Sequence, residues 1–475
     1  MNVLANLQPA RVFAIFEQLS SIPHGSGNTA AISAWCYDFA IDLGLQANRD
    51  EVGNVIIKKA GSTGRENEPA VILQAHLDMV CEKTAEKEFD FLTQGISLVT
   101  DGVKVWADGT TLGADNGIGM AMILALMEDT TLSHPPLEGV LTVDEETGLE
   151  GATAIDFSDF KGRRMINLDS EDEGVFTAGC AGGIRLETLF SITEVPNGLP
   201  AYSVQVKGLA GGHSGIEINK GRANANRELA FLLQGLSQKG TVQLASINGG
   251  TVDNAIAAEA SCVVACDLAY ETICATAKDL EQTLIQKGES SARVLVELTN
   301  ASNVWEDAQT KAILGYLTQA PNGVQAMCKD LPTLVETSLN LGVVRSNAQT
   351  VSVTFSLRSA VEAEKTALLT RLINLAEGFG ATTTPSGDYP GWEYRADSAL
   401  QETMKQVYTE LYGKDPVVDV IHAGLECGLF CKKCPELDAV SIGPDMRNVH
   451  SPEEWVSVAS VARVYEYLVA LLANI

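Results

Sequence analysis

The sequence predicts an α/β protein of two domains: a mostly parallel sheet with helices on both faces, and an α+β domain inserted into it. Three observations lead to this fold class. The chain has 475 residues, which is more than one ordinary hydrophobic core organises. Up to about residue 185, nearly continuous apolar segments alternate with helical patterns, as in a parallel sheet covered on both faces. Beyond that point, strand candidates alternate polar and apolar residues, which is typical of a sheet with one open face.

The first part of the chain is expected to begin with two helices and then alternate strands with a helix. Residues 9–45 carry two helical patterns around a turn at Ser21–Gly27. Asn54–Lys59 and Pro69–Leu77 are strand candidates, and the second is almost entirely apolar. Gly113–Asp129 opens with a glycine-rich turn and continues as a helix. The other central-strand candidates here are Gly139–Asp144 and Met165–Leu168.

The inserted part is expected to contain two similar halves, because its strand and helix candidates recur in the same sequence of types. It begins near Leu186, and no repeat is visible residue by residue. The strand candidates are Tyr202–Val206, Cys262–Leu268, Arg293–Leu298 and Val351–Leu357. The helix candidates are Ala223–Gly235, Tyr270–Ile285, Glu306–Leu317 and Ala363–Gly378.

The chain is then expected to return to the first domain. Ser386–Arg395 has the composition of a linker, Ala439–Gly443 resumes the buried-strand pattern, and Ser457–Leu472 forms a closing amphipathic helix. The predicted boundaries are therefore 1–185 and 396–475 for the first domain and 186–395 for the insertion.

Composition and charge exclude several classes of protein. Lysine and arginine total 33 against 61 acidic residues, a net charge of −28, which disfavours nucleic acid and anionic membranes as partners. No apolar run is long enough to span a bilayer, and the N-terminus does not have the pattern of a signal peptide. The ten cysteines lack the spacing of a secreted scaffold. We expect a soluble cytoplasmic protein with free thiols.

Acid-rich segments follow the predicted central strands at their carboxyl ends, where open α/β sheets bind ligands. Within these segments and a late loop lie two imidazoles and three carboxylates. They are His76, Asp115, Glu146, Asp169 and His450. Nitrogen and oxygen ligands of this kind suit a pair of zinc-like ions with one shared carboxylate, and such two-metal sites are typical of hydrolases.

Most of these residues also have an ordinary structural interpretation, and His76 could be a strand-end histidine held by the neighbouring Asp78. Asp115 lies among glycines at a predicted helix start, where it could cap the helix. His450 precedes a predicted helix and could cap it or pack there. The acidic run that contains Glu145 and Glu146 could be solvated, although adjacent carboxylates repel one another unless a cation offsets them. Asp78 is two residues from His76, so both side chains would point to the same side and Asp78 could orient the imidazole.

Two further residues and one cysteine group are candidates outside the pentad. His213 lies in the loop Gly211-Gly212-His213-Ser214-Gly215, whose small residues would present its imidazole. Arg358 could bind a carboxylate with two hydrogen bonds, although a surface ion pair is the alternative. A trio of cysteines has a spacing that suits zinc or an iron–sulfur cluster, but without a fourth nearby thiol in the sequence we assign it to helix packing. The trio is Cys427, Cys431 and Cys434. We assign no metal role to His24, His134 and His422.

Six motifs in order resemble the M20 family of dinuclear-zinc peptidases, and within it the branch of aminoacyl-histidine dipeptidases. The resemblance covers essentially the whole chain. The motifs are His76-Leu77-Asp78, the glycine-rich segment Gly113–Gly119, Asp144-Glu145-Glu146-Thr147-Gly148, Asn167-Leu168-Asp169-Ser170-Glu171, Gly211-Gly212-His213-Ser214-Gly215 and Val449-His450-Ser451-Pro452-Glu453-Glu454.

The resemblance implies a role for each site residue. Asp115 would bridge two zinc ions per chain, with cobalt or manganese as substitutes. His76 and Asp169 would complete one metal, and Glu146 and His450 the other. Glu145 would be the general base and Asp78 would orient His76. The peptide bond from Asp115 to Asn116 would be cis.

The resemblance also implies the arrangement and assembly of the insertion. Its length is about twice one ferredoxin-like unit, so it would be a duplicated lid over the catalytic domain. Smaller family members pair through a single-unit lid that lends its histidine to the partner. We therefore expect a homodimer, although a doubled lid could imitate that pairing within a monomer, and His213 could act in cis or in trans.

Together these inferences predict a metal-dependent dipeptidase. The resemblance favours dipeptides with histidine at the C-terminal position, such as β-alanyl-histidine, with broader specificity. His213 would stabilise the oxyanion and Arg358 would bind the substrate's C-terminal carboxylate. The alternatives are an N-acyl-amino-acid deacylase, a non-catalytic metal-binding protein and, most weakly supported, an iron–sulfur protein. Glu145 beside the five ligands argues against a non-catalytic role, because metal binding alone does not need a base.

Overall fold

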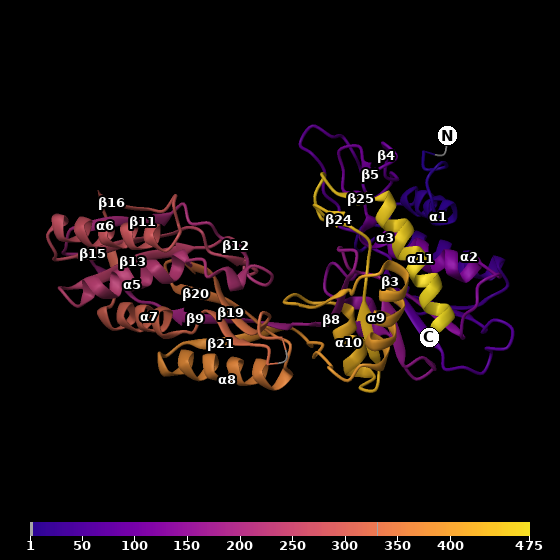
Figure 1. Ribbon diagram of the computed structural model, residues 1–475. Helices are drawn as coiled ribbons and strands as arrows, with labels where there is room; N and C mark the ends of the chain where they lie inside the picture. The colour runs from indigo at the N-terminus through magenta and orange to yellow at the C-terminus, as the bar shows by residue number, and fades with distance from the viewer. Residues whose placement is uncertain (1–2, 330) are drawn as a thin grey trace. The chain divides into compact units, whose positions relative to one another are not determined.

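The computed structural model describes residues 3–329 and 331–475, and the chain divides into two compact units. Unit 1 comprises Met1–Cys180, Trp392–Val420 and Leu425–Ile475, and unit 2 comprises Ala181–Gly391 and Ile421–Gly424 (Figure 1). The short segment Ile421–Gly424 was not anticipated as part of the insertion. The catalytic and lid assignments of the predicted domains stay predictions. In the described part of the chain, no helix is long and apolar enough to cross a membrane.

Unit 1 is built on an eight-stranded sheet whose four central strands are parallel, as the sequence predicted. β3 and β6 are buried along their whole length, which explains their nearly continuous apolar sequences. In sheet order the strands are β1 (Gln46–Arg49), β2 (Val55–Lys59), β6 (Leu137–Thr142), β3 (Val71–His76), β7 (Arg164–Asn167), β23 (Asp438–Ser441), β8 (Val175–Cys180) and β22 (Val417–Ile421).

Helices cover both faces of this sheet. Val71, Leu73 and Ala75 of β3 share a hydrophobic core with helices α1, α3, α9 and α11. The intervening residue Gln74 points to the other face, where its amide contacts Glu426 of α10. The helices are α1 (Ala10–Ser20), α2 (Ala30–Asp42), α3 (Ala114–Glu128), α4 (Glu150–Ala154), α9 (Ala399–Tyr412), α10 (Glu426–Lys433) and α11 (Val458–Asn474). A smaller sheet contains β24 (Met446–Arg447), β25 (Trp455–Ser457), β5 (Lys104–Ala107) and β4 (Leu98–Thr100).

Unit 2 contains one long antiparallel sheet made of two nested ferredoxin-like halves. One half is continuous in sequence and has the order βαββαβ. Its elements are β11 (Ala201–Lys207), α5 (Ala225–Ser237), β13 (Val242–Gly249), β15 (Ala260–Cys266), α6 (Tyr270–Gln286) and β16 (Arg293–Thr299). The other half begins before this one and finishes after it. Its elements are β9 (Gly182–Ser191), α7 (Asp307–Gln319), β19 (Val335–Ser346), β20 (Thr350–Ser359), α8 (Glu362–Gly378) and β21 (Thr382–Tyr389).

The two halves join edge to edge, which confirms the predicted duplication. The sheet order is β16-β11-β15-β13-β19-β20-β9-β21, so the second strand of one half meets the second strand of the other. Helices α5, α6, α7 and α8 contribute to a single hydrophobic core with these strands. The remaining elements of unit 2 are β10 (Glu194–Pro196), β12 (Gly212–His213), the 3-10 turn Ile218–Lys220, β14 (Ala255–Ile256), β17 (Asn303–Trp305) and β18 (Gly323–Met327).

One expected element was wrong in type. Ser386–Arg395 was expected to be a linker, but its first residues belong to β21, which pairs with β9 along the edge of the sheet. Pro385 and Gly387 gave this segment the composition of a linker. An edge strand tolerates proline, because one side of its backbone has no neighbouring strand.

Candidate metal centre

The structure brings the five predicted ligands together in unit 1, around Asp115. One oxygen of Asp115 lies 3.1 Å from Nε2 of His76, and the other lies 3.3 Å from Nε2 of His450. Nε2 of His76 is also 3.3 Å from Asp169, and Nε2 of His450 is 2.9 Å from Glu146. The pentad is therefore arranged as two sets of predicted ligands that share the carboxylate of Asp115.

Parallel strands explain why residues distant in sequence meet here. β6, β3 and β7 are neighbours with parallel register, so their carboxyl ends lie at the same edge of the sheet. His76 is the last residue of β3, Glu146 follows β6, and Asp169 follows β7. Asp115 enters from the start of α3, and His450 from the loop between β24 and β25. His450 has a φ of 62°, a left-handed conformation that is unusual for histidine.

The charges in the pentad depend strongly on one another. Burial alone would lower the pKa of His76, but Asp169, Asp115 and Asp78 raise it well above its ordinary value. Hydrogen bonds to Asp115 and Glu146 raise the pKa of His450 to about 11. Burial opposes ionisation of Asp115, yet the two imidazoles lower its pKa overall. Positive charge on the neighbouring groups therefore stabilises the ionised carboxylates of the pentad.

The donor set fits divalent cations. One ligand atom each from His76, Asp115 and Glu146 lies within 4.8 Å of the others, the one such group found in residues 3–329 and 331–475. Imidazole nitrogen and carboxylate oxygen are good zinc ligands, and a metal binds them in place of protons. The raised pKa values of the two histidines show how strongly the carboxylates favour positive charge at these nitrogens.

Two expectations for Asp115 can be compared with the structure. Its interpretation as a helix cap is wrong: the N-cap of α3 is Gly113, and the side chain of Asp115 faces the two histidines. The peptide bond from Asp115 to Asn116 is cis, as the resemblance implied. Asn116 donates a hydrogen bond from its side chain to Asp169, so it holds a second predicted ligand.

Asp78 holds more than His76. Nδ1 of His76 lies 3.0 Å from the main-chain oxygen of Asp78 and 3.4 Å from its carboxylate. The same carboxylate accepts hydrogen bonds from the backbone N–H of Glu145 at 2.9 Å and of Glu146 at 3.2 Å, and from the hydroxyl of Ser26 at 2.7 Å. Asp78 therefore fixes the loop that carries Glu145 as well as the imidazole.

The surroundings of Glu145 raise the affinity of its carboxylate for a proton. Burial raises the pKa of its carboxyl well above the ordinary value; nearby Asp169, Glu426 and Glu146 act in the same direction, while His76 opposes them. Groups with a perturbed pKa beside a candidate metal centre are candidates for general acid or base.

Glu454 is a residue of the site that the sequence did not reveal. Its carboxylate is buried and accepts hydrogen bonds from four consecutive backbone N–H groups, those of Leu112, Gly113, Ala114 and Asp115, at 2.7 to 3.4 Å. The glycine-rich turn before α3 is thus built around one carboxylate. The only sequence signal was its place in the segment that carries His450.

Replacing Glu454 by alanine should lower the free energy of unfolding by about 2–3 kcal/mol, because buried N–H groups lose their acceptor. It should also weaken metal binding, since Asp115 is the last of the four residues held. Urea unfolding and metal titration would measure the two effects. Glu453→Ala is the matched control, because Glu453 is exposed; equal behaviour of the two variants would contradict the assigned role.

Glu426 is a second missed residue. It is fully buried, and one of its oxygens accepts hydrogen bonds from Gln74 at 2.5 Å and Thr142 at 2.7 Å. Gln74 also accepts a hydrogen bond from Asn167. These contacts connect α10 to β3, β6 and β7, the strands that precede three of the ligands. Burial raises the pKa of Glu426 to about 8.

In unit 2, backbone contacts fix the tautomer of His213. Its Nδ1 accepts hydrogen bonds from the N–H groups of Gly215 at 3.1 Å and Ile216 at 3.2 Å. Burial and Arg358 both lower the pKa of His213, which favours the neutral ring. In a neutral imidazole whose Nδ1 is an acceptor, Nε2 carries the proton. His213 therefore offers one N–H donor.

Arg358 is not in a surface ion pair, so that interpretation is wrong. Only 9% of the residue is exposed, and no carboxylate in the described part of the chain forms an ion pair with it. Its Nη1 donates a hydrogen bond to the hydroxyl of Tyr389 at 3.0 Å, and its Nε is buried with no hydrogen-bond partner among residues 3–329 and 331–475.

The cysteine trio has a fourth neighbour that the sequence could not show. Cys180 lies close enough to raise the pKa of both Cys427 and Cys431, although burial is the main cause. All ten cysteines are free thiols. No cysteine belongs to a group of potential metal ligands among the residues that the structure describes. The structural assignment of the trio stays a prediction.

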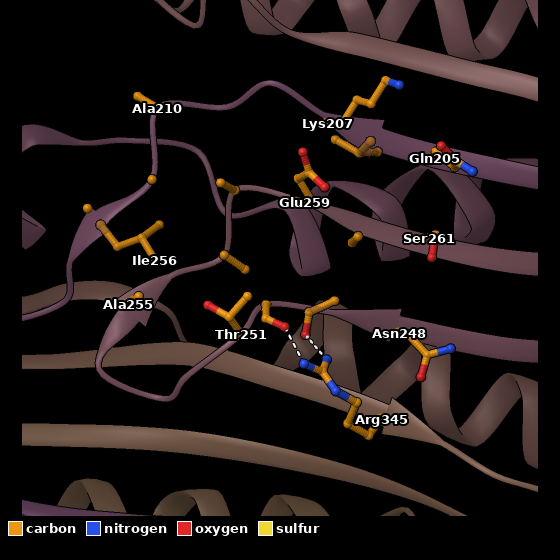
Figure 2. Close-up of a pocket in the computed structure, with 18 residues that line it drawn as sticks. Gln205, Lys207, Ala210, Asn248, Thr251, Ala255, Ile256, Glu259, Ser261 and Arg345 are labelled. Atoms are coloured by element: carbon orange, nitrogen blue, oxygen red, sulfur yellow. Dashed lines mark hydrogen bonds between the residues drawn. The ribbon is translucent and has the colours of Figure 1, made fainter. Parts of the chain in front are cut away.

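Unit 2 also has an open cavity of about 730 Å³ on its sheet (Figure 2). Arg345 lies in its wall, but its guanidinium already donates to the carbonyl oxygens of Val344, Gly249 and Gly250. Lys207 and Glu259 bring opposite charges to the lining. The cavity therefore has no strong preference for either sign of charge.

The chain belongs to the peptidase family M20/M25/M40, whose model matches residues 72–474. The matched region contains all five predicted ligands together with Glu145 and Asp78. The family is one of hydrolases, in agreement with the class of site that the geometry defines.

Two relatives with 38% identity extend over nearly the whole chain. The cytosol non-specific dipeptidase of Escherichia coli K12 is 38% identical over 482 residues, covering 100% of this chain and 99% of the relative. The solved structure of aminoacylhistidine dipeptidase from Vibrio alginolyticus has a TM-score of 0.92 and 38% identity, covering 99% of this chain and 98% of that one. The aminopeptidase PepT of Bacillus cereus, at 15% identity and a TM-score of 0.58 with 98% and 99% coverage, shares the fold.

Proposed function

We propose that this protein is a metal-dependent dipeptidase that uses two zinc ions and acts on Xaa-His dipeptides such as β-alanyl-histidine, with broader specificity. The observation that carries the proposal is the pentad arranged around Asp115, with the half-buried Glu145 three residues beyond the end of β6. The names of the two full-length relatives, a non-specific dipeptidase and an aminoacylhistidine dipeptidase, support the substrate class.

In this proposal the five ligands form two sets. His76 and Asp169 hold one ion, Glu146 and His450 hold the other, and Asp115 is shared, in keeping with the distances between them. Bound zinc ions would polarise the scissile carbonyl and lower the pKa of a water to about 7. Cobalt or manganese could substitute, since nitrogen and oxygen ligands accept all three.

Glu145 is the proposed general base. Its carboxylate takes a proton from the attacking water and passes it to the nitrogen of the leaving amine. The hydrogen bond from its backbone N–H to Asp78 holds it in place. Because Asp78 also contacts His76, one carboxylate orients both a ligand and the base.

His213 is the proposed donor to the oxyanion, because its tautomer leaves Nε2–H free to donate. A neutral donor held by two backbone amides needs no reorganisation when negative charge develops on the carbonyl oxygen. The assignment of His213 to the same chain or to a partner, and the homodimer itself, stay predictions.

Replacing His213 by phenylalanine should lower kcat by about 10²–10³-fold with little change in KM, the size expected for the loss of one oxyanion donor. Steady-state kinetics on a dipeptide would measure it. Ile216→Ala is the control, since Ile216 is exposed in the same loop. A His213→Phe variant that changes only KM would move His213 from the oxyanion to ground-state binding.

Arg358 is the proposed partner of the substrate's C-terminal carboxylate. A nearly buried guanidinium that has no acidic partner among the residues the structure describes suits an anion that arrives with the substrate. A carboxylate site of this kind would favour substrates whose free C-terminus lies close to the cleaved bond, as in a dipeptide.

A substrate panel tests the proposal. It contains β-alanyl-histidine, glycyl-histidine and alanyl-alanine, with acetyl-amino acids as matched amides, each assayed after chelation and again after zinc is restored. We expect dipeptide cleavage that is lost on chelation and returns with zinc. Cleavage of acetyl-amino acids alone would make the protein a deacylase, and metal binding without turnover would make it a non-catalytic metal-binding protein.

A further inference from the structure

Four residues form a row across the sheet of unit 2 at Arg358. Ser338 on β19 pairs with Arg358 on β20, Arg358 pairs with Gly183 on β9, and Gly183 pairs with Tyr389 on β21. Residues directly opposite one another in antiparallel strands project side chains from the same face. Ser338, Arg358 and Tyr389 therefore share one face, with Gly183 between the last two.

Gly183 allows Tyr389 to reach the arginine. A Cβ atom at Gly183 would lie 2.5 Å from the tyrosine ring, so no other residue fits there without displacing it. The ring crosses the glycine and places its hydroxyl 3.0 Å from Nη1 of Arg358. The guanidinium is oriented in this way by a group that carries no charge.

His422 reaches the same row from the segment Ile421–Gly424. Its Nε2 lies 2.7 Å from the hydroxyl of Ser338, and the segment is held by a hydrogen bond from the N–H of Ala181 to the carbonyl of Ile421 at 3.1 Å. Only 7% of His422 is exposed. Burial, with Arg358 and His213, lowers the pKa of His422 to about 3, so the ring is neutral near pH 7.

Among the described residues, the side-chain hydrogen bonds of Arg358 and Ser338 are thus with neutral groups, a tyrosine hydroxyl and an imidazole. A buried charge is normally paired, because its desolvation is costly. Arg358 instead has a tyrosine hydroxyl on one side and a serine–histidine pair on the other. The unneutralised charge is available to an anion from outside the chain.

We propose that His422 is a positioning residue that determines specificity. Bound to Ser338, it keeps this side of Arg358 uncharged, so that the guanidinium stays available to substrates that end in a free carboxylate. The proposal rests on the proposed dipeptidase function and adds a residue and a selection rule to it. A carboxylate at position 422 would form an ion pair with Arg358 within the chain. The preference for substrates with a free carboxylate would then be lost.

The test compares alanyl-alanine with alanyl-alanine amide as substrates of the zinc-loaded full chain. The unmodified protein should favour the free acid by about tenfold or more in kcat/KM, the size of one hydrogen bond to a charged group. His422→Glu should raise KM for alanyl-alanine by about tenfold or more and bring the ratio of the two substrates towards one. His422→Gln, neutral and of similar size, should keep the ratio of the unmodified protein.

Several results would overturn the proposal. These are equal cleavage of acid and amide by the unmodified protein, an unchanged ratio in a folded His422→Glu variant, or the same loss in His422→Gln as in His422→Glu. If His422→Glu does not fold, Ser338→Asp and its neutral control Ser338→Asn make the same comparison directly opposite Arg358. Absence of all dipeptide cleavage by the unmodified protein would refute the proposed function as well. Dipeptide cleavage with unchanged selectivity in a folded His422→Glu variant would refute the role of His422 alone.

Discussion

Replacing Glu145 by glutamine should lower kcat on dipeptides by about 10²–10⁴-fold, the contribution expected of a positioned general base. The amide keeps the size of the side chain but cannot accept the proton of the attacking water. The hydrogen bond that fixes this residue is made by its backbone N–H to Asp78, so the loop should keep its conformation. KM should change little, because Glu145 is not one of the ligands of the pentad.

Measuring the metal content distinguishes loss of the general base from loss of metal binding. The Glu145→Gln variant should bind as much zinc as the unmodified protein, measured by elemental analysis after dialysis. Glu150→Gln is a matched control, since Glu150 is an exposed glutamate on the same segment after β6. Turnover retained by Glu145→Gln would assign the base to another group, and loss of zinc would make Glu145 a ligand.

Replacing Asp115 by alanine should have the second large effect, the loss of both ions and of nearly all turnover. The two oxygens of Asp115 face the two histidines, one each, so its removal takes a predicted ligand from each set. Zinc affinity should fall by more than the roughly 10–100-fold that follows loss of an outer partner of a metal ligand. Isothermal titration of the chelated protein with zinc would measure both stoichiometry and affinity.

The matched control for this variant is Asp108→Ala. Asp108 lies in the chain shortly before Asp115, but its side chain is 68% exposed and pairs with Lys87 at the surface. It should bind zinc normally. One zinc ion retained at full affinity by Asp115→Ala would show that the two sets of ligands do not share this carboxylate.

The central strands and the pentad could be predicted because their signals are local. β3 and β6 are buried on both faces, so their composition alone distinguishes them from half-exposed strands. Each acidic ligand follows such a strand or opens a glycine-rich turn, and the parallel pairing that joins them is the default of alternating strands and helices. The roles of the individual residues are not tested by geometry alone and stay predictions.

The residues that support the site could not be predicted, because their partners are distant in the chain. Glu454 accepts hydrogen bonds from residues about 340 positions earlier, and Glu426 binds Gln74 across 352 positions. The local sequence around these two glutamates does not indicate their contacts, which become visible only in the folded structure. The sequence indicates no metal role for His422 and does not show its contact with Ser338, because Ser338 belongs to a strand, β19, that the sequence did not predict.

Nesting in unit 2 has a consequence for the order in which the protein can fold during synthesis. The half from Ala201 to Thr299 is continuous, so all of its strands are available once that stretch has left the ribosome. Strand β9 is made earlier, yet its neighbours β20 and β21 follow about 160 residues or more later, so it must wait with both edges unpaired. The inner half can therefore close first and offer β13 as the edge on which the outer half assembles, and premature pairing of β9 is the misfolding hazard that this arrangement carries.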